Sequence, residues 1–152
     1  MKGIHYLASV VRVYREALDR YCDDPATFSS RPEWMDELRK ISHRGYTTGF
    51  FLGAPVDVDR EFNSRYVRSH DIVGIVEENR QDGKAVIGVR NRLAAGDTVE
   101  FIGRGMSLFR HCLREMTDEK GAPLQLAHPN QKILVEVPFN TEKFDLVRRE
   151  KH

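Results

Sequence analysis

The chain contains little cysteine, and this excludes several kinds of site. Two of its 152 residues are cysteines, and Cys22 and Cys112 lie far apart and outside any Cys-x-x-Cys pair. A disulfide framework is not expected for such a chain, and an iron–sulfur cluster normally needs about four thiolates. We therefore interpret both cysteines as half-buried thiols without a chemical role.

Long apolar runs and a strong charge imbalance are also absent. No run approaches the roughly 20 apolar residues of a membrane-spanning helix, and Arg12 and Arg15 interrupt the stretch where a signal peptide would lie. Lysine and arginine number 24 against 23 aspartates and glutamates, so the net charge is +1. We expect a cytoplasmic globular protein without a membrane partner, in which any nucleic-acid contact depends on local arginines rather than on overall charge.

The sequence motifs of common catalytic centres are missing as well. It contains no Gly-x-Ser-x-Gly elbow, no P-loop and no His-Glu-x-x-His among its six histidines. Cys112 directly follows His111, but neighbouring side chains diverge on a strand and on a helix, so the pair does not form an activated thiol. We assign no catalytic residue and no metal ligand in this chain.

Apolar periodicity predicts helices in the amino-terminal part. Ile4, Leu7, Val11 and Leu18 recur at helical spacing, which predicts a helix from about residue 4 to Cys22, with Arg12 among the residues of its polar side. A second helix is expected after Ser29, with Ser30 as the N-cap, Pro32 in the first turn, and an apolar side of Trp34, Met35 and Leu38.

Short apolar segments separated by turn residues predict a mostly β remainder. The expected strands are Ile72–Val76, Lys84–Val89, Val99–Ile102, Leu108–Met116, Leu124–Leu126 and Ile133–Val137. A hairpin turn is expected at residues 81–83, a second turn at residues 118–121, and a frayed basic terminus at residues 148–151. Short strands at even spacing favour a small closed barrel, because closure removes exposed strand edges.

The order of these strands resembles a known barrel. The similar features are Gly74-x-Val76, the run Val89–Leu93, and Gly96-Asp97, in which glycine permits a positive φ and aspartate caps the turn. They resemble the second domain of translation elongation factors, a six-stranded Greek-key barrel that contacts RNA in its own family. The expected fold is therefore a small Greek-key β-barrel preceded by one or two α-helices.

Three segments carry a second resemblance. They are Met1–Arg15, the run Ile41–Phe51 with its His43-Arg44-Gly45-Tyr46 core, and Ala127–Gln131. Together they resemble the carboxyl-terminal domain of peptidase family U32, the collagenase-like proteases, with the segment that precedes it.

This resemblance implies a domain organisation. Met1 aligns with an internal methionine of the family pattern, so residues 1–40 would be linker helices from the end of a missing upstream domain, and residues 41–152 the carboxyl-terminal barrel domain. In the family the upstream domain resembles a TIM barrel, and in several relatives it carries four cysteines for an iron–sulfur cluster. We expect any such cluster in that domain and assign no cofactor to this chain.

Six residues are candidates for binding RNA or another anionic ligand. They are His43, Arg44, Tyr46, Thr47, Arg90 and Arg92. Guanidinium groups suit phosphate, and aromatic rings stack on unpaired bases. Each also has a structural interpretation: Arg44 as an internal ion pair, Tyr46 with Phe50 and Phe51 as barrel core, and Arg90 with Arg92 as one solvated strand face.

The resemblance implies a function in outline. Some family members resemble enzymes that hydroxylate tRNA or ribosomal RNA, which suggests a non-catalytic accessory domain that positions RNA and packs on the upstream barrel domain. One alternative is part of a protease that recognises peptide substrate, as the family name implies. The other is a structural lid that packs on the upstream domain through the apolar face of residues 4–18.

Overall fold

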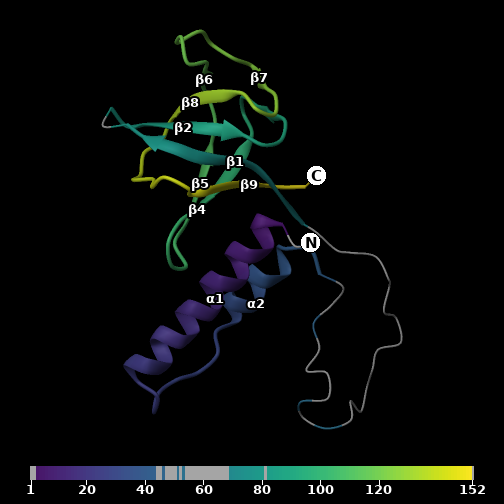
Figure 1. Cartoon of the computed structure of the whole chain (residues 1–152), viewed down its shortest axis with the longest axis vertical. Helices are drawn as coiled ribbons and strands as arrows, with labels where there is room; N and C mark the ends of the chain where they lie inside the picture. The colour runs from purple at the N-terminus through teal and green to yellow at the C-terminus, as the bar shows by residue number, and fades with distance from the viewer. Residues whose placement is uncertain are drawn as a thin grey trace.

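The protein consists of a helical part and a mostly β part. The computed structural model describes residues 3–43, 46, 51, 53, 69–80 and 82–151. The helices are α1 (Ile4–Asp23) and α2 (Pro32–Arg39), which lie side by side at one end of the molecule (Figure 1). The strands are β1 (His70–Asn79), β2 (Lys84–Val89), β3 (Leu93–Ala94), β4 (Thr98–Ile102), β5 (Leu108–Cys112), β6 (Met116–Thr117), β7 (Leu126–Ala127), β8 (Lys132–Glu136) and β9 (Leu146–Glu150).

Helix α1 confirms the helix predicted from apolar periodicity. It runs from Ile4 and ends at Asp23, two residues before Pro25, which cannot continue a helix. Its buried residues are His5, Ser9, Arg12 and Val13, so the polar side faces the rest of the molecule. Six large apolar side chains remain 51–63% exposed on the other side: Ile4, Leu7, Val11, Tyr14, Leu18 and Tyr21. We call these six residues the apolar stripe of α1.

Helix α2 begins where expected but with a different cap. Pro32 is its first residue and Arg31 occupies the N-cap position without a side-chain hydrogen bond, so the prediction of Ser30 as the cap was wrong. Proline suits this position because its fixed φ is already helical and no amide proton is needed there. The helix buries Trp34 and Glu37. A buried carboxylate needs charged or hydrogen-bonding partners, so we expect other elements to supply them to Glu37.

The β part is one curled antiparallel sheet with a small ribbon. Seven strands follow the order β5-β4-β9-β1-β2-β8-β6, and β3 pairs with β7 separately. The concave side holds an apolar core that includes Val73, Ile87, Phe101, Leu113 and Val147, all at most 1% exposed. The mostly β, barrel-like fold preceded by helices is thereby confirmed.

Glycine shapes two places in this sheet. Gly74 lies in β1 next to Ile87 of the paired strand β2, and an added Cβ would lie 2.4 Å from Cγ2 of Ile87. A side chain therefore does not fit at this position. Gly96 has a φ of 91°, and the carboxylate of Asp97 accepts a hydrogen bond from the amide of Ala94. The glycine–aspartate turn predicted from the sequence is therefore confirmed, and its physical reason is the positive φ.

Several strand predictions need correction. The terminus expected to fray is strand β9, which pairs with both β1 and β4. The expected strand Leu108–Met116 is divided into β5 and β6 by residues 113–115. Both cysteines are exposed rather than half-buried. Among the described residues, no helix has the length and apolar character needed to cross a membrane.

Candidate functional site

The structure brings two of the predicted site residues together. The ring centroids of His43 and Tyr46 lie 4.9 Å apart, and the hydroxyl of Tyr46 donates a hydrogen bond to the carbonyl of Leu38 at the end of α2. Partial burial raises the pKa of Tyr46, so the phenol stays neutral. Tyr46 therefore packs on the helical part and Phe51 is exposed, so neither is the barrel core residue that was the alternative interpretation.

The other predicted residues lie elsewhere. Arg90 and Arg92 are exposed in the connection between β2 and β3, which corrects their expected position on one face of a strand. Arg44 and Thr47 lie outside the described residues. Arg90 and Arg92 follow β2, whereas Tyr46 and His43 lie beside the end of α2, so the two pairs belong to different parts of the fold.

A buried charge cluster, which the sequence did not suggest, joins the helices to the sheet. Arg148 of β9 is 0% exposed, and its guanidinium binds Glu37 of α2 through two nitrogens, at 2.7 and 2.8 Å. Its Nε donates to Oε2 of Glu100 in β4 at 2.8 Å. This fork matches the planar geometry of a carboxylate and fixes the angle between the partners.

Further polar groups surround these three residues. From α1, the Ser9 hydroxyl donates to Glu37, and the Arg12 guanidinium lies 3.5 Å from it while also donating to the carbonyls of Gly105 and Ser107. Lys40 lies 3.7 Å from Glu37, and Arg110 of β5 donates to Glu100 at 2.9 Å. His5 and His70 complete what we call the Arg148 cluster. The helices are thus held on the sheet by matched charges.

The cluster keeps its carboxylates ionised. Burial alone would raise the pKa of Glu37, but the hydrogen bonds and charge of Arg148, with Arg12 and Lys40, outweigh it and lower that pKa to about 2. The pKa of Glu100 is also about 2, because Arg110 and Arg148 outweigh its burial. Burial and the nearby charge of Arg148 lower the pKa of His70, which favours a neutral ring.

One part of the cluster has the residue types of a hydrolase triad. The Ser69 hydroxyl lies 2.9 Å from Nδ1 of His70, and Nε2 of His70 lies 3.7 Å from Oε2 of Glu100. The second distance is too long for a hydrogen bond, and Arg148 and Arg110 already engage both oxygens of Glu100. The group is therefore arranged to hold the helices rather than to activate a serine.

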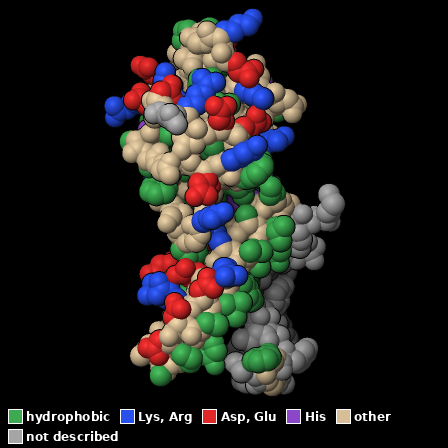
Figure 2. Space-filling model, turned by 60° about the vertical axis from the view of Figure 1, so that its left-hand side comes forward, with side chains coloured by type: hydrophobic (Ala, Val, Ile, Leu, Met, Phe, Trp, Pro, Cys, Tyr) green, Lys and Arg blue, Asp and Glu red, His purple; other side chains and the backbone are tan. Residues whose placement is uncertain are grey.

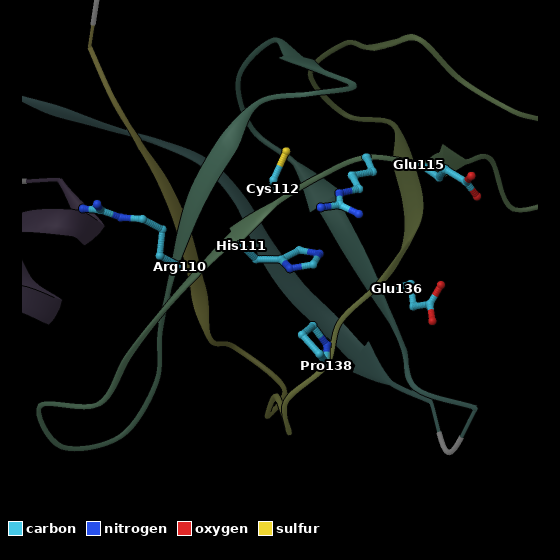
Figure 3. Close-up of a pocket in the computed structure, with 7 residues that line it drawn as sticks. Arg110, His111, Cys112, Glu115, Glu136 and Pro138 are labelled. Atoms are coloured by element: carbon cyan, nitrogen blue, oxygen red, sulfur yellow. The ribbon is translucent and has the colours of Figure 1, made fainter.

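One cavity lies where the sheet remains open, beside its edge strand β5. A cavity of about 450 Å³ is lined by residues 110–112, Arg114, Glu115, Glu136 and Pro138. It lies beside β5 and the end of β8, and we call it the seam cavity. Figure 3 shows Arg110 directed toward the helices, whereas His111, Glu136 and Pro138 surround the opening. Among the described residues no cluster of histidine, cysteine or carboxylate side chains could hold a metal ion.

Sequence reasoning missed the Arg148 cluster for a simple reason. Arg148 is adjacent to Arg149, Glu150 and Lys151, which resembles a solvated tail, and its partners lie 48 and 111 positions away. A signal was present in the alternation of Leu146, Val147 and Arg148, where an apolar pair precedes the charges. That signal is too short to distinguish a strand from a terminus.

Comparisons with known proteins give consistent similarities. The chain is 36% identical over 99% of its length to "tRNA hydroxylation protein P1" of Bacillus subtilis, and spans 36% of that relative. It is 33% identical over 34% of its length to a "Collagenase" of Porphyromonas gingivalis, and spans 14% of it. The chain thus spans about a third or less of these curated relatives.

A solved structure and two family profiles extend the similarity. The C-terminal domain of a Geobacillus thermoleovorans protein assigned to the U32 peptidases superimposes with a TM-score of 0.50 at 28% identity, covering 52% of this chain and 99% of that one. The profile of peptidase family U32 matches residues 1–61, and that of the peptidase family U32 C-terminal domain matches residues 68–148. This chain belongs to peptidase family U32, and its curled sheet is the C-terminal domain of that family.

Proposed function

We propose that this chain is a non-catalytic accessory domain that positions tRNA for a hydroxylation enzyme. The observation that carries the proposal is the 36% identity to a tRNA hydroxylation protein, which extends over 99% of the chain. The matched region covers both the helical part and the sheet, so the similarity is not confined to one of the two parts. Ribosomal RNA is the alternative substrate for the same contacts, because it offers the same phosphates and unpaired bases as tRNA.

The distribution of charge supports RNA contact at the sheet. Arg90 and Arg92 are exposed on one tight connection, and no described residue forms an ion pair with either. The arginines of the Arg148 cluster, in contrast, are engaged by carboxylates. Exposed guanidinium groups bind phosphate by releasing counterions, and His43 with Tyr46 adds an aromatic surface at the end of α2.

The proposal is tested by titrating labelled tRNA with this chain at two salt concentrations. Each phosphate contact contributes roughly 0.9 to the slope of log affinity against log salt, so Arg90→Ala/Arg92→Ala is expected to lower the slope by about 2. The matched control is Arg15→Ala/Arg39→Ala, which removes the same charge from exposed positions on the helices. No binding at low salt would contradict the proposal.

A second candidate function is docking of a preceding domain onto α1. The stripe residues are spaced alternately three and four apart, the pattern of a helix–helix seam, and all six are exposed. Figure 2 shows hydrophobic side chains at the surface of the lower, helical part of the molecule. An exposed apolar surface of this extent on one helix marks a contact with another protein surface. Residues 1–40 would then be linker helices that pack on the upstream domain, and residues 41–152 the domain that they hold in place.

Size measurements of this chain test the docking function. With the stripe uncovered, the chain is expected to self-associate as its concentration rises, and Leu7→Asp/Val11→Asp is expected to keep it monomeric. Arg20→Glu, on the opposite side of α1, makes the same change in net charge and should leave association unchanged. Equal association of the parent chain and the Leu7→Asp/Val11→Asp variant would exclude the stripe as a docking surface.

Two further assignments follow from the family. Peptide recognition within a protease is the alternative that the name of the Porphyromonas relative supports, but that similarity covers 34% of this chain.

An iron–sulfur cluster does not fit the residues of this chain, which has two cysteines where about four thiolates are required. We therefore place any cluster in the domain that would precede this one.

A further inference from the structure

The seam cavity lies at the free edge of the curled sheet. Strand β5 pairs with β4 on one side only, and four of its five residues are exposed on their side chains. Cys112 and His111 line the cavity from this strand, and Glu136 and Pro138 line it from the far side. A volume of about 450 Å³ falls within the range of pockets that hold small planar ligands.

Aromatic rings lie beside this opening, and one of them, His111, lines the cavity itself. Phe139 stacks on Phe109 with ring centroids 4.7 Å apart and 10° between the planes, and it meets His111 edge-on at 5.9 Å. Phe109 remains 42% exposed despite this contact, so the stack presents aromatic surface to solvent. Another flat ring can extend such a stack, because offset stacking is favourable for any pair of aromatic systems.

Three of the charged side chains that line the cavity differ from Arg110, which also lines it but is paired with Glu100. Arg114 offers guanidinium donors, and Glu115 and Glu136 offer carboxylate acceptors. None of these three side chains forms an ion pair with another residue in the part of the chain that the structure describes. A ligand that suits them carries both acceptors and donors on a planar edge. Nucleobases have this property, since their edges combine ring nitrogens, carbonyls and exocyclic amines.

We infer that the seam cavity binds an unpaired nucleobase of the RNA, packed against His111 next to the Phe109–Phe139 stack and hydrogen-bonded by Arg114 and a carboxylate. This inference rests on the proposed function and assigns it a site distinct from the six residues predicted from the sequence. A base within a duplex has both faces stacked and its pairing edge occupied, so the site selects single-stranded loops.

The two exposed cysteines allow a direct test. Cys112 lines the seam cavity, whereas Cys22 lies on α1 and serves as an internal control. The rate at which iodoacetamide alkylates each thiol is measured with no RNA, with a single-stranded RNA hexamer of mixed sequence, and with the same hexamer in a duplex. The single strand is expected to slow alkylation of Cys112 at least fivefold and leave Cys22 unchanged, and the duplex to protect neither.

Substitutions provide an independent readout. Arg114→Gln is expected to weaken single-strand binding by about tenfold, the size typical of a lost hydrogen bond to a charged group. His111→Leu removes the ring that lines the cavity but keeps an apolar side chain, and it should weaken binding by a similar factor. The control, Arg104→Gln, neutralises an arginine that is exposed in the β4–β5 connection and paired with Glu142, and binding should not change.

The outcomes separate this inference from the proposed function. If tRNA binds but Cys112 stays reactive and Arg114→Gln has no effect, the seam cavity is not the site and the proposed function stands. If tRNA does not bind at low salt, both fail. If an extended peptide protects Cys112 while RNA does not, the free edge of β5 accepts a peptide strand, and the nucleobase assignment is overturned.

Discussion

The barrel core and the interface between helices and sheet are equally buried but have opposite chemistry. On strand β9, Val147 and Arg148 are neighbours, both 0% exposed, and they face opposite sides of the sheet. Val147 belongs to the apolar core inside the curl, whereas Arg148 meets Glu37 of α2 and Glu100 of β4. A single strand therefore supplies both kinds of contact.

The two regions are stabilised by different physical effects. Apolar burial is non-directional, so the core favours a compact sheet without specifying one arrangement in detail. A buried ion pair contributes little net stability, because the cost of removing both charges from water offsets their attraction. Its hydrogen bonds form in one geometry only, however, so it specifies how the elements are oriented. We infer that the Arg148 cluster sets the orientation of α1 and α2, and that the core supplies most of the stability of the sheet.

The largest effect is expected from Arg148→Ala, which breaks the interface and leaves Glu37 and Glu100 buried without their partner. Removing one partner of a buried pair costs about 3–5 kcal/mol, because the remaining charge is uncompensated. The free energy of unfolding is measured in urea, and the fluorescence of Trp34, the single tryptophan, reports on the helical part.

The adjacent arginine is the control for that substitution. Arg149 is partly exposed and pairs with Asp97, so Arg149→Ala is expected to cost at most about 1 kcal/mol, as for surface ion pairs. Equal losses from the two alanine variants would show that the Arg148 cluster does not hold the helices.

A smaller effect is expected from Gly74→Ala, which tests the core. The new methyl group would lie 2.4 Å from Cγ2 of Ile87, and overpacking of this kind costs about 1–3 kcal/mol. Gly3→Ala is the control, because nothing lies within 4 Å of that position. Urea unfolding followed by circular dichroism gives the free energy of unfolding of both variants. If Gly74→Ala loses less stability than Gly3→Ala, then β1 and β2 adjust freely to the added methyl group.

The smallest effect is expected from mild acid, which sharpens the comparison because the two carboxyl groups whose pKa values are lowered to about 2 both lie at the interface. The pKa values of Glu37 and Glu100 are lowered from 4.5 to about 2, so their contribution to stability is complete above pH 4.5 and is lost as the pH falls toward 2. Between pH 7 and pH 4 the free energy of unfolding is expected to fall by on the order of 1 kcal/mol for each of the two carboxyl groups.

The measurement for acid is Trp34 fluorescence beside the circular dichroism of the sheet. The tryptophan signal is expected to change first, because the charges lie between the helices and the sheet while the core contains no carboxylate. In Glu37→Gln the early change should be reduced. Simultaneous change of both signals in the parent chain would mean that the interface and the core unfold as one unit.

Much of the secondary structure was predictable from local signals. Helix α1 follows from apolar periodicity and Pro25, and β1, β2, β4 and β8 follow from short apolar runs with glycine or aspartate at their ends. Strand β9 was missed because its second half is charged, and strand propensity carries little information where a side chain is buried by pairing with another charge.

Less of the candidate site was predictable. The contact between the rings of His43 and Tyr46 was not predicted. The position of Arg90 and Arg92 was predicted wrongly, since β2 ends at Val89, just before them. The seam cavity combines β5 with the end of β8, segments separated by more than 20 positions. No sequence pattern relates residues that meet only because a sheet curls.

The sequence by itself determined helix α1, the start of α2, strands β1, β2, β4 and β8, and the glycine–aspartate turn, because these depend on residues that are close in the chain. Tertiary structure alone decided which side of α1 faces the sheet and that Arg148 is buried. A periodic pattern shows that a helix has two sides but not which side is covered. The polar side of α1 is covered here because Glu37 and Glu100, brought from distant elements, supply the charges that make burial of Arg12 and Arg148 favourable.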